Sequence, residues 1–435
     1  MSLELHPKCK ERLVEVIAGQ LPSVVVKNRM FLDRKSAIDL VDAESVLPQA
    51  GGVREALNKY IGELPVFEFV CESLSKELHD FQEYSTEFPE LKLTDIGPYA
   101  DPVATASKLI NDFDSLPWKY CLTIKFEEDL SKAVGRLIGN YFISNSFRII
   151  TPSDVFRKEF PVESGIKGRD LSLWGRMSFL SIPIPQEWKE GETYIQVETE
   201  GFVGQYGETA TVERAIAEVK AFCGLAVALR LFKIGYKYRP PAEKTEFVVH
   251  QKVDNSWVIQ RTLELDANIA NTFNDLVLYD LDGKLDTDAK LLKWALSILG
   301  SIKTVFSTGK KAERIVLASQ WLYDSYVGGN ELLSFVLSTV VLEILLGDKA
   351  ASDLVGLGEL LRNRCAYLIG KSRQQREQIL RDFQEIYDVC SKIVHRGHSR
   401  LSSRERMLLR NLQWMCRRVV LEEVNLLQKD LEGNT

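Results

Sequence analysis

The sequence contains few of the residues from which metal centres and disulfide frameworks are built. Five histidines occur in 435 residues, and the seven cysteines are scattered, odd in number and without a CxxC pair. Zinc sites and disulfide-rich domains require such residues at close, regular spacing. We therefore expect reduced cysteines that are mostly buried, no bound metal and no cofactor.

Long apolar runs are also missing. The most apolar segment, residues 332–346, contains Glu343. It is shorter than the roughly 20 residues that a transmembrane helix needs. The first residues of the chain mix charged and apolar side chains and lack the apolar core of a secretory signal peptide. These absences predict a cytoplasmic protein that does not contact a membrane.

Charge is present in quantity, but it is unevenly distributed. The net charge is −6, whereas residues 361–420 contain fourteen lysines and arginines against five acidic residues, a local balance of +9. The rest of the chain therefore sums to −15. A basic segment on an acidic protein favours contact with a polyanion at that end. A helical surface whose charges are merely solvated has the same composition, so the segment alone does not establish binding.

The length and the periodicity of the chain predict three parts. A chain of 435 residues exceeds one ordinary core. Residues 1–140 have mainly helical periodicity, and residues 141–285 combine alternating, strand-like runs with a helix over about 211–232. From residue 286 onward the period is helical. We therefore predict an α+β multidomain protein with a helical N-terminal region, a mixed middle region and an all-α bundle over 286–435.

The helices expected in this bundle are separated by glycines. The first is expected to begin at Asp286 or Thr287, either of which can cap it. The others are expected over about 311–326, 331–346, 354–369, 374–394 and 402–430. Short connections between them indicate antiparallel neighbours.

Four segments of the last third carry a family resemblance. In chain order they are ERIVLA (313–318), VLEILLG (341–347), LRNRCAYLIG (361–370) and IYDVCSKIVHRG (386–397). Their order and spacing resemble the HEPN domains of the Apea-like group, with the tract YDVCSKIVHRG carrying most of the specificity. The resemblance covers about a third of the chain. It implies a helical bundle that forms a homodimer and acts on RNA in bacterial antiviral defence. The first two thirds of the chain are then expected to sense an unknown trigger or to restrain this effector.

The resemblance also implies a chemistry and names its residues. Many HEPN domains are metal-independent ribonucleases, a class of hydrolase, marked by an arginine, four to six further residues and a histidine on one helix. His395 matches the histidine, which moves protons near neutral pH. The arginine, which stabilises charge on the phosphoryl oxygens, is replaced by Cys390, and no other Arg-x(4–6)-His occurs in the chain.

Several interpretations of this replacement remain open. In the first, the bundle is catalytically silent and binds RNA or a protein partner. In the second, it cleaves RNA with Arg396, Lys392 or Arg364 as the cation. In the third, Cys390 is an inactivating change. Cys390 and His395 are also a candidate thiol–imidazole dyad. Five residues of helix turn about 500°, however, and leave two side chains roughly 140° apart.

Four further side chains were considered as supporting groups. The resemblance places Arg364 near the functional face and makes Arg362 and Tyr387 candidates for RNA contact. The simpler interpretation pairs the two arginines with Glu359 or Asp353.

Glu343 lies inside an apolar run, where an unpaired charge is costly. We expect it to pair with an arginine of a neighbouring helix.

Overall fold

A computed structural model describes residues 3–82, 84–162, 187–205, 209–235, 245–279, 287–348, 356–397 and 399–433. The chain forms two compact units. The first consists of Met1–Cys121, Glu198–Ala215 and Val249–Leu263, and the second of Leu122–Val197, Ile216–Val248 and Glu264–Thr435. This division differs from the three consecutive ranges predicted, 1–140, 141–285 and 286–435. The reason is that strands far apart in the sequence pair in one sheet, so the chain enters each unit three times.

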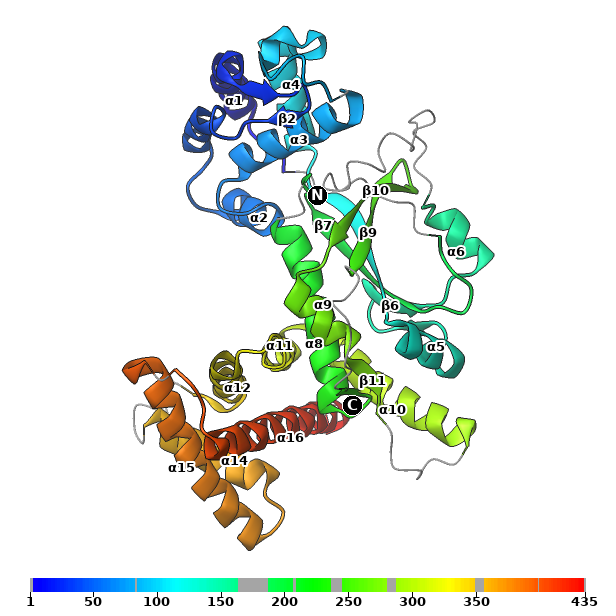
Figure 1. Cartoon of the computed structure of the whole chain (residues 1–435), viewed down its shortest axis with the longest axis vertical. Helices are drawn as coiled ribbons and strands as arrows, with labels where there is room; N and C mark the ends of the chain where they lie inside the picture. The colour runs from blue at the N-terminus through cyan, green and yellow to red at the C-terminus, as the bar shows by residue number, and fades with distance from the viewer. Residues whose placement is uncertain are drawn as a thin grey trace. The chain divides into compact units, whose positions relative to one another are not determined.

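The first unit is built mainly of helices (Figure 1). They are α1 (Pro7–Gln20), α2 (Gly52–Tyr60), α3 (Pro65–Phe81) and α4 (Pro102–Asp114). The 3-10 turns are η1 (Leu21–Ser23), η2 (Ile38–Val46), η3 (Leu93–Asp95) and η4 (Gly97–Tyr99). A small antiparallel sheet, which the sequence did not indicate, has the order β2 (Phe31–Leu32), β1 (Val25–Lys27), β3 (Glu90–Lys92). The mainly helical periodicity predicted for this part of the chain is confirmed by these helices.

An aromatic cluster fills the centre of this unit. Phe69 on α3 is fully buried, and its ring centroid lies 5.2 Å from that of Phe113 and 4.8 Å from that of Phe202. Burying rings of this size supplies much of the driving force for packing α3 against α4.

A six-stranded sheet contains residues of both units, since four of its strands, β4, β7, β9 and β10, include residues of each. Its order is β10 (Ser256–Glu264), β9 (Glu246–Val253), β4 (Trp118–Lys125), β7 (Tyr194–Gly201), β6 (Phe147–Ile150), β5 (Tyr141–Phe142). The strands predicted from the alternating runs are present at the expected places. In the turn between β9 and β10, Asp254 and Asn255 both adopt positive φ, 46° and 67°, as a tight hairpin requires.

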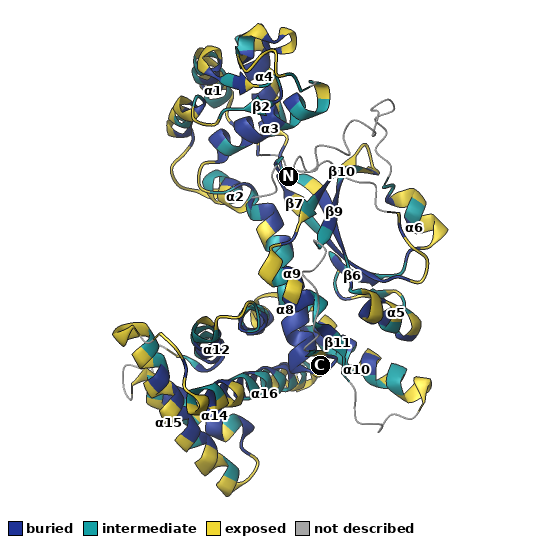
Figure 2. Cartoon of the chain, viewed as in Figure 1, coloured by how far each residue is buried: buried dark blue, intermediate teal, exposed yellow. Residues whose placement is uncertain are grey.

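The second unit adds short elements around the rest of this sheet. They are α5 (Glu128–Leu137), α6 (Asp154–Glu159), α9 (Ala267–Asn274) and the antiparallel pair β8 (Phe232–Ile234) and β11 (Leu276–Leu278). Helix α8 (Ala210–Ala228) starts in the first unit and continues in the second, and its last turns are buried (Figure 2). It is shorter than the predicted 211–232, because Arg230 adopts a left-handed φ of 66° and the chain turns into β8.

Every regular element described after residue 287 is a helix. They are α10 (Asp288–Ser307), η5 (Gly309–Ala312), α11 (Glu313–Asp324), α12 (Glu331–Leu346), α14 (Leu357–Ile369), α15 (Arg373–Arg396) and α16 (Ser403–Gly433). The predicted helices are confirmed, with α12 matching 331–346 at both ends. Thr287 caps α10 by accepting a hydrogen bond from the N–H of Lys290, while Asp286, the other candidate cap, lies outside the described residues.

None of the described helices combines the length and the apolar character that a membrane crossing requires. The described residues also contain no group of three or more histidine, cysteine, aspartate or glutamate side chains arranged to hold a metal ion.

Candidate functional site

Helix α15 carries the family-like tract and buries one face only. Ser372 caps its N-terminus by accepting a hydrogen bond from the N–H of Gln375. At the other end Gly397 adopts the left-handed conformation, φ 62° and ψ 39°, and its N–H donates to the carbonyl of Lys392. Glycine takes this conformation without a steric penalty, so it ends the helix directly after Arg396.

The imidazole of His395 lies on the solvent side of α15. Ile386, which is buried, precedes it by nine residues, or about 180° of helix, so the two side chains point in opposite directions. Lys392 lies one helical turn before both His395 and Arg396, because helix positions three or four apart are neighbours on one surface. His395 and Arg396 are consecutive, so their side chains point about 100° apart around the helix. All three side chains are exposed, and none is joined by a hydrogen bond or ion pair to another described residue. We call Lys392, His395 and Arg396 the α15 terminal face.

The thiol of Cys390 points toward a different neighbour. It is half-buried where α15 packs on α12, and the α12 side chains that act on it are Thr339 and Glu343. Burial raises the pKa of Cys390, and the nearby Glu343 carboxylate raises it further, whereas a hydrogen bond from Thr339 opposes the rise. The thiol is therefore neutral at physiological pH. Together with the angular separation from His395, this argues against a thiol–imidazole dyad within one chain.

We expect Cys390 to react slowly with iodoacetamide, because the thiolate is the reactive species and its fraction falls as the pKa rises. At pH 7.5 its rate in the native full chain should fall below that of free glutathione, as followed by peptide mass spectrometry. In the urea-unfolded chain the same residue should approach the glutathione rate. Native labelling faster than glutathione would instead indicate a thiolate stabilised by a nearby cation, and would restore the dyad.

The prediction that Glu343 pairs with an arginine of a neighbouring helix is wrong. Glu343 is half-buried and burial raises the pKa of its carboxyl, but no basic side chain in the described part of the chain pairs with it. The arginines that reach α12 bind at its ends. Arg314 and Arg364 donate to carbonyls at its C-terminus, and Arg406 pairs with Glu331 at its first residue. The C-terminal carbonyls lack partners within the helix and attract cations, which explains why these arginines bind there.

Arg364 is too far from His395 to assist it within one chain. The side chain donates to the carbonyl of Leu346 at 2.8 Å and lies 3.8 Å from the carboxylate of Asp348. Helices α14 and α15 are antiparallel, since Arg362 hydrogen-bonds Gln384. Arg364 is consequently level with residue 381 or 382, roughly fourteen residues and about 20 Å along the helix from His395.

The other two supporting candidates lie between α14 and α15. Arg362 contacts Glu359 at 3.6 Å, as the simpler interpretation predicted. Tyr387 is 37% exposed, and its ring lies next to Gly358, where an added Cβ would be 3.1 Å from it. This partly exposed phenol lies about two helical turns before His395 on α15 and is available to stack on a base.

Several of the basic side chains in residues 361–420 are neutralised by ion pairs. Arg373, Arg404 and Arg418 form ion pairs with Glu377, Glu385 and Glu422. The exposed cations of this range without a described side-chain partner are Lys371, Lys392, Arg396, Arg400 and Arg410. Three of these five lie at or just after the end of α15, so that end carries a local cluster of positive charge.

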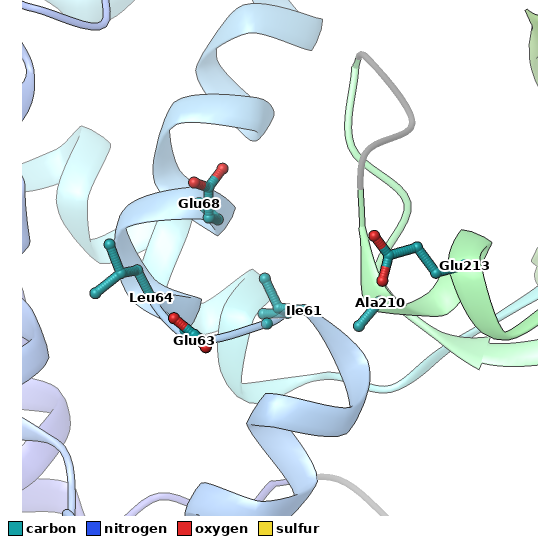
Figure 3. A pocket seen from close by; sticks show the side chains of 7 residues that line it. Ile61, Glu63, Leu64, Glu68, Ala210 and Glu213 are labelled. Atoms are coloured by element: carbon teal, nitrogen blue, oxygen red, sulfur yellow. The ribbon is translucent and has the colours of Figure 1, made fainter. Parts of the chain in front are cut away.

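A separate hollow of about 320 Å³ lies in the first unit (Figure 3). Its polar lining is acidic, with Glu63 just before α3, Glu68 in the first turn of α3 and Glu213 on α8. Carboxylates at this place repel phosphate groups and provide no cation, so the hollow does not suit a polyanion.

Comparison with known proteins identified no relative of this chain. No family model, no curated protein and no solved structure matches this chain. The likeness to HEPN domains therefore stays an expectation drawn from the residues of the last third.

The sequence did not point to two residues that matter at this site. Thr339 acts on Cys390, and its only signal was its position one helical turn before Glu343. Arg314 holds the C-terminus of α12 by donating to the carbonyl of Ile344 at 2.7 Å. No pattern in the sequence distinguishes such a long-range cap from a solvated arginine.

Proposed function

We propose that this chain is a cytoplasmic, HEPN-like effector directed at RNA, an attenuated metal-independent endoribonuclease of bacterial antiviral defence. The observation that carries the proposal is the α15 terminal face. An imidazole and two cations are exposed there within the last turns of α15, and they are not engaged by other described side chains. Such a set can bind a phosphate group and move a proton beside it.

The roles follow from the chemistry of each side chain. Lys392 and Arg396 bind the RNA backbone, and His395 takes the proton of the 2′-hydroxyl or supplies one to the departing 5′-oxygen. Both 2′-hydroxyl attack and departure of the 5′-oxygen place negative charge on the phosphoryl group, which needs a fixed cation. Cys390 cannot provide that cation, and for this reason we expect slow turnover.

A homodimer completes the proposal. His395 faces away from the packed side of its own bundle, so a second chain can approach it without displacing any helix. One chain supplies one imidazole, and two-fold pairing through α15 supplies both a proton acceptor and a proton donor. The first unit then contributes the response to a trigger.

A non-catalytic HEPN-like module that binds RNA or a protein partner is the second candidate. The position of Cys390 favours it, because the residue expected to complete the catalytic set faces α12 rather than His395. The two candidates differ in a single respect, turnover.

The test compares the parent with His395→Ala and with the double variant Lys392→Ala/Arg396→Ala, in the presence of a chelator. We expect slow cleavage of single-stranded RNA by the parent and none by His395→Ala. Binding by the double variant should weaken about tenfold or more, and the slope of log K against log salt should fall by about 1.4 for two lost contacts.

Arg373→Ala is the matched control, because Arg373 lies on the same helix at its other end, is 94% exposed and pairs with Glu377. It should leave binding and cleavage unchanged. Binding without cleavage by the parent would establish the second candidate. Equal weakening by Arg373→Ala would mean that the whole basic surface, and not the α15 terminal face, contacts RNA.

A further inference from the structure

The turn between α14 and α15 presents a tyrosine ring to solvent beside a guanidinium group. Tyr367, in the last turn of α14, is 71% exposed. The guanidinium carbon of Arg376, in the first turn of α15, lies 5.3 Å from the centre of this ring. Nε of Arg376 also donates a hydrogen bond to the carbonyl of Gly370 at 3.0 Å. The arginine is therefore held over one face of the ring, although both side chains lie at the surface.

Positive charge is in excess around this ring. Residues 367–381 contain four basic side chains against one acidic side chain, a balance of +3. Arg373 pairs with Glu377 at 2.9 Å, so the charges of these two residues cancel. The remaining cations are exposed and form no ion pair with a described residue, and they are Lys371, Arg376 and Arg381. An exposed ring among cations suits a polyanion that carries flat, apolar groups, and RNA is such a molecule.

A second ring lies on the same side of α15. Tyr387 follows Arg376 by eleven residues, which is within about 20° of three complete turns, so both side chains leave the helix in nearly one direction. Gly358 of α14 leaves room for the ring of Tyr387, since an added Cβ would lie 3.1 Å from it. His395 lies about 12 Å further along the helix and about 80° around it. The hairpin of α14 and α15 therefore carries aromatic and basic side chains from its turn to the α15 terminal face.

We propose that the α14–α15 turn is a second contact for single-stranded RNA, in which the open face of Tyr367 stacks on an unpaired base while Arg376 and Lys371 bind adjoining phosphates. This assignment deepens the proposed function and rests on it for the identity of the polyanion. Every base can stack on a phenol ring, so the contact holds the RNA without reading its sequence. A base inside a duplex is already stacked between its neighbours, so paired RNA cannot use the ring.

The distance between the two contacts sets the length of RNA that can use both. From Arg376 to His395 the axis of α15 rises about 28 Å. A stacked strand advances about 3.4 Å per nucleotide, so about eight nucleotides connect the two ends. An RNA of four nucleotides reaches only one end at a time. The second contact therefore predicts a dependence on RNA length that the α15 terminal face alone does not produce.

The experiment measures the binding of single-stranded RNA of twelve and of four nucleotides to the full chain by fluorescence anisotropy, with a chelator present. Tyr367→Ala should weaken binding of the longer RNA about tenfold, the usual effect of losing one stacked base. Tyr367→Phe keeps the ring and should bind like the parent, whereas Tyr367→Leu should behave like Tyr367→Ala. The shorter RNA retains the other contact when one is lost, so Tyr367→Ala should change its affinity by no more than about twofold.

Phe142→Ala is the matched control. Phe142 is 58% exposed, and the guanidinium carbon of Arg148 lies 5.9 Å from the centre of its ring, so it reproduces a ring beside an arginine outside the basic excess. This variant should leave the binding of both RNAs unchanged. The thermal midpoints of all variants should lie within about 3 °C of the parent, because the replaced rings are largely exposed. A loss of affinity at an unchanged midpoint reports a lost contact and not a lost fold.

The outcomes separate this inference from the proposed function. Equal binding of the longer RNA by the parent and Tyr367→Ala, with weaker binding by Lys392→Ala/Arg396→Ala, overturns the second contact and leaves the proposed function intact. Weaker binding by Tyr367→Ala alone supports the second contact and contradicts the role of the α15 terminal face. A fully paired RNA that is equally sensitive to Tyr367→Ala would contradict base stacking. Failure of the parent to bind either RNA overturns both.

Discussion

Replacing Gly224 by alanine is expected to destabilise the second unit by about 3 kcal/mol, the upper end of the usual cost of overpacking. Gly224 lies in α8 where this helix crosses α11. A Cβ added to it would lie 1.9 Å from the carbonyl oxygen of Ser319 and 2.7 Å from its carbonyl carbon. Both are backbone atoms, so no side chain can rotate away, and the two helices would have to separate.

Separation of α8 from α11 would also disturb the contacts that flank this crossing. Lys220 on α8 pairs with Asp324 on α11 at 2.8 Å, and both side chains are largely buried, at 16% and 19% exposure. Ser319 and Tyr323 are buried next to them. A buried pair pulled apart leaves charges that solvent reaches poorly, which adds to the loss.

The measurement is the thermal midpoint of the full chain, which should fall by about 6–10 °C. Gly300→Ala in α10 is the matched control. It is also a helical glycine of the second unit, but an added Cβ would meet nothing within 4 Å. That variant should be neutral or more stable, by up to about 1 kcal/mol, since alanine favours the helix. A midpoint for Gly224→Ala equal to that of Gly300→Ala would mean that α8 and α11 do not pack so closely.

Replacing Glu44 by alanine is expected to have a similar effect on the first unit. The buried carboxylate of Glu44 on η2 accepts hydrogen bonds from the backbone N–H groups of Val66 and Phe67, at 2.7 and 3.1 Å. It also accepts one from Arg54 at 3.1 Å. Residue Leu64, at the N-cap of α3, offers no side-chain cap. Glu44, although distant in the sequence, therefore caps the N-terminus of α3 in place of a side chain at the N-cap position. Its removal leaves three donors without a partner.

We expect a loss of about 2–4 kcal/mol for Glu44→Ala, because each buried donor left unsatisfied costs about 1–3 kcal/mol and water reaches some of them. Glu44→Gln should cost less, since an amide oxygen still accepts and burial already raises the pKa of this carboxyl. The comparison is Glu15→Ala, which breaks only an exposed pair with Arg12 and should change stability by less than about 0.5 kcal/mol. Denaturant unfolding followed by circular dichroism distinguishes these cases. Equal stability of Glu44→Ala and Glu15→Ala would contradict the capping role.

Local pattern was enough to locate most helices and several strands. Helix α12 was predicted at both ends, because Asn330 before it and Gly347 after it are strong start and stop residues. The hairpin at Asp254 and Asn255 followed from residues that tolerate positive φ. The three-stranded sheet of the first unit was missed, because strands of two or three residues are too short to show a period.

The sequence by itself therefore determined where most of the helices lie and that the last third of the chain is helical, and it singled out His395 as a candidate. Only the tertiary structure decided what each buried face meets. It packed α15 on α12, turned Arg364 to the end of α12, brought Gly224 onto Ser319 and joined distant strands in one sheet. Periodicity is a property of neighbouring residues. Partners between elements depend on how whole helices and strands pack, and no local pattern encodes that choice.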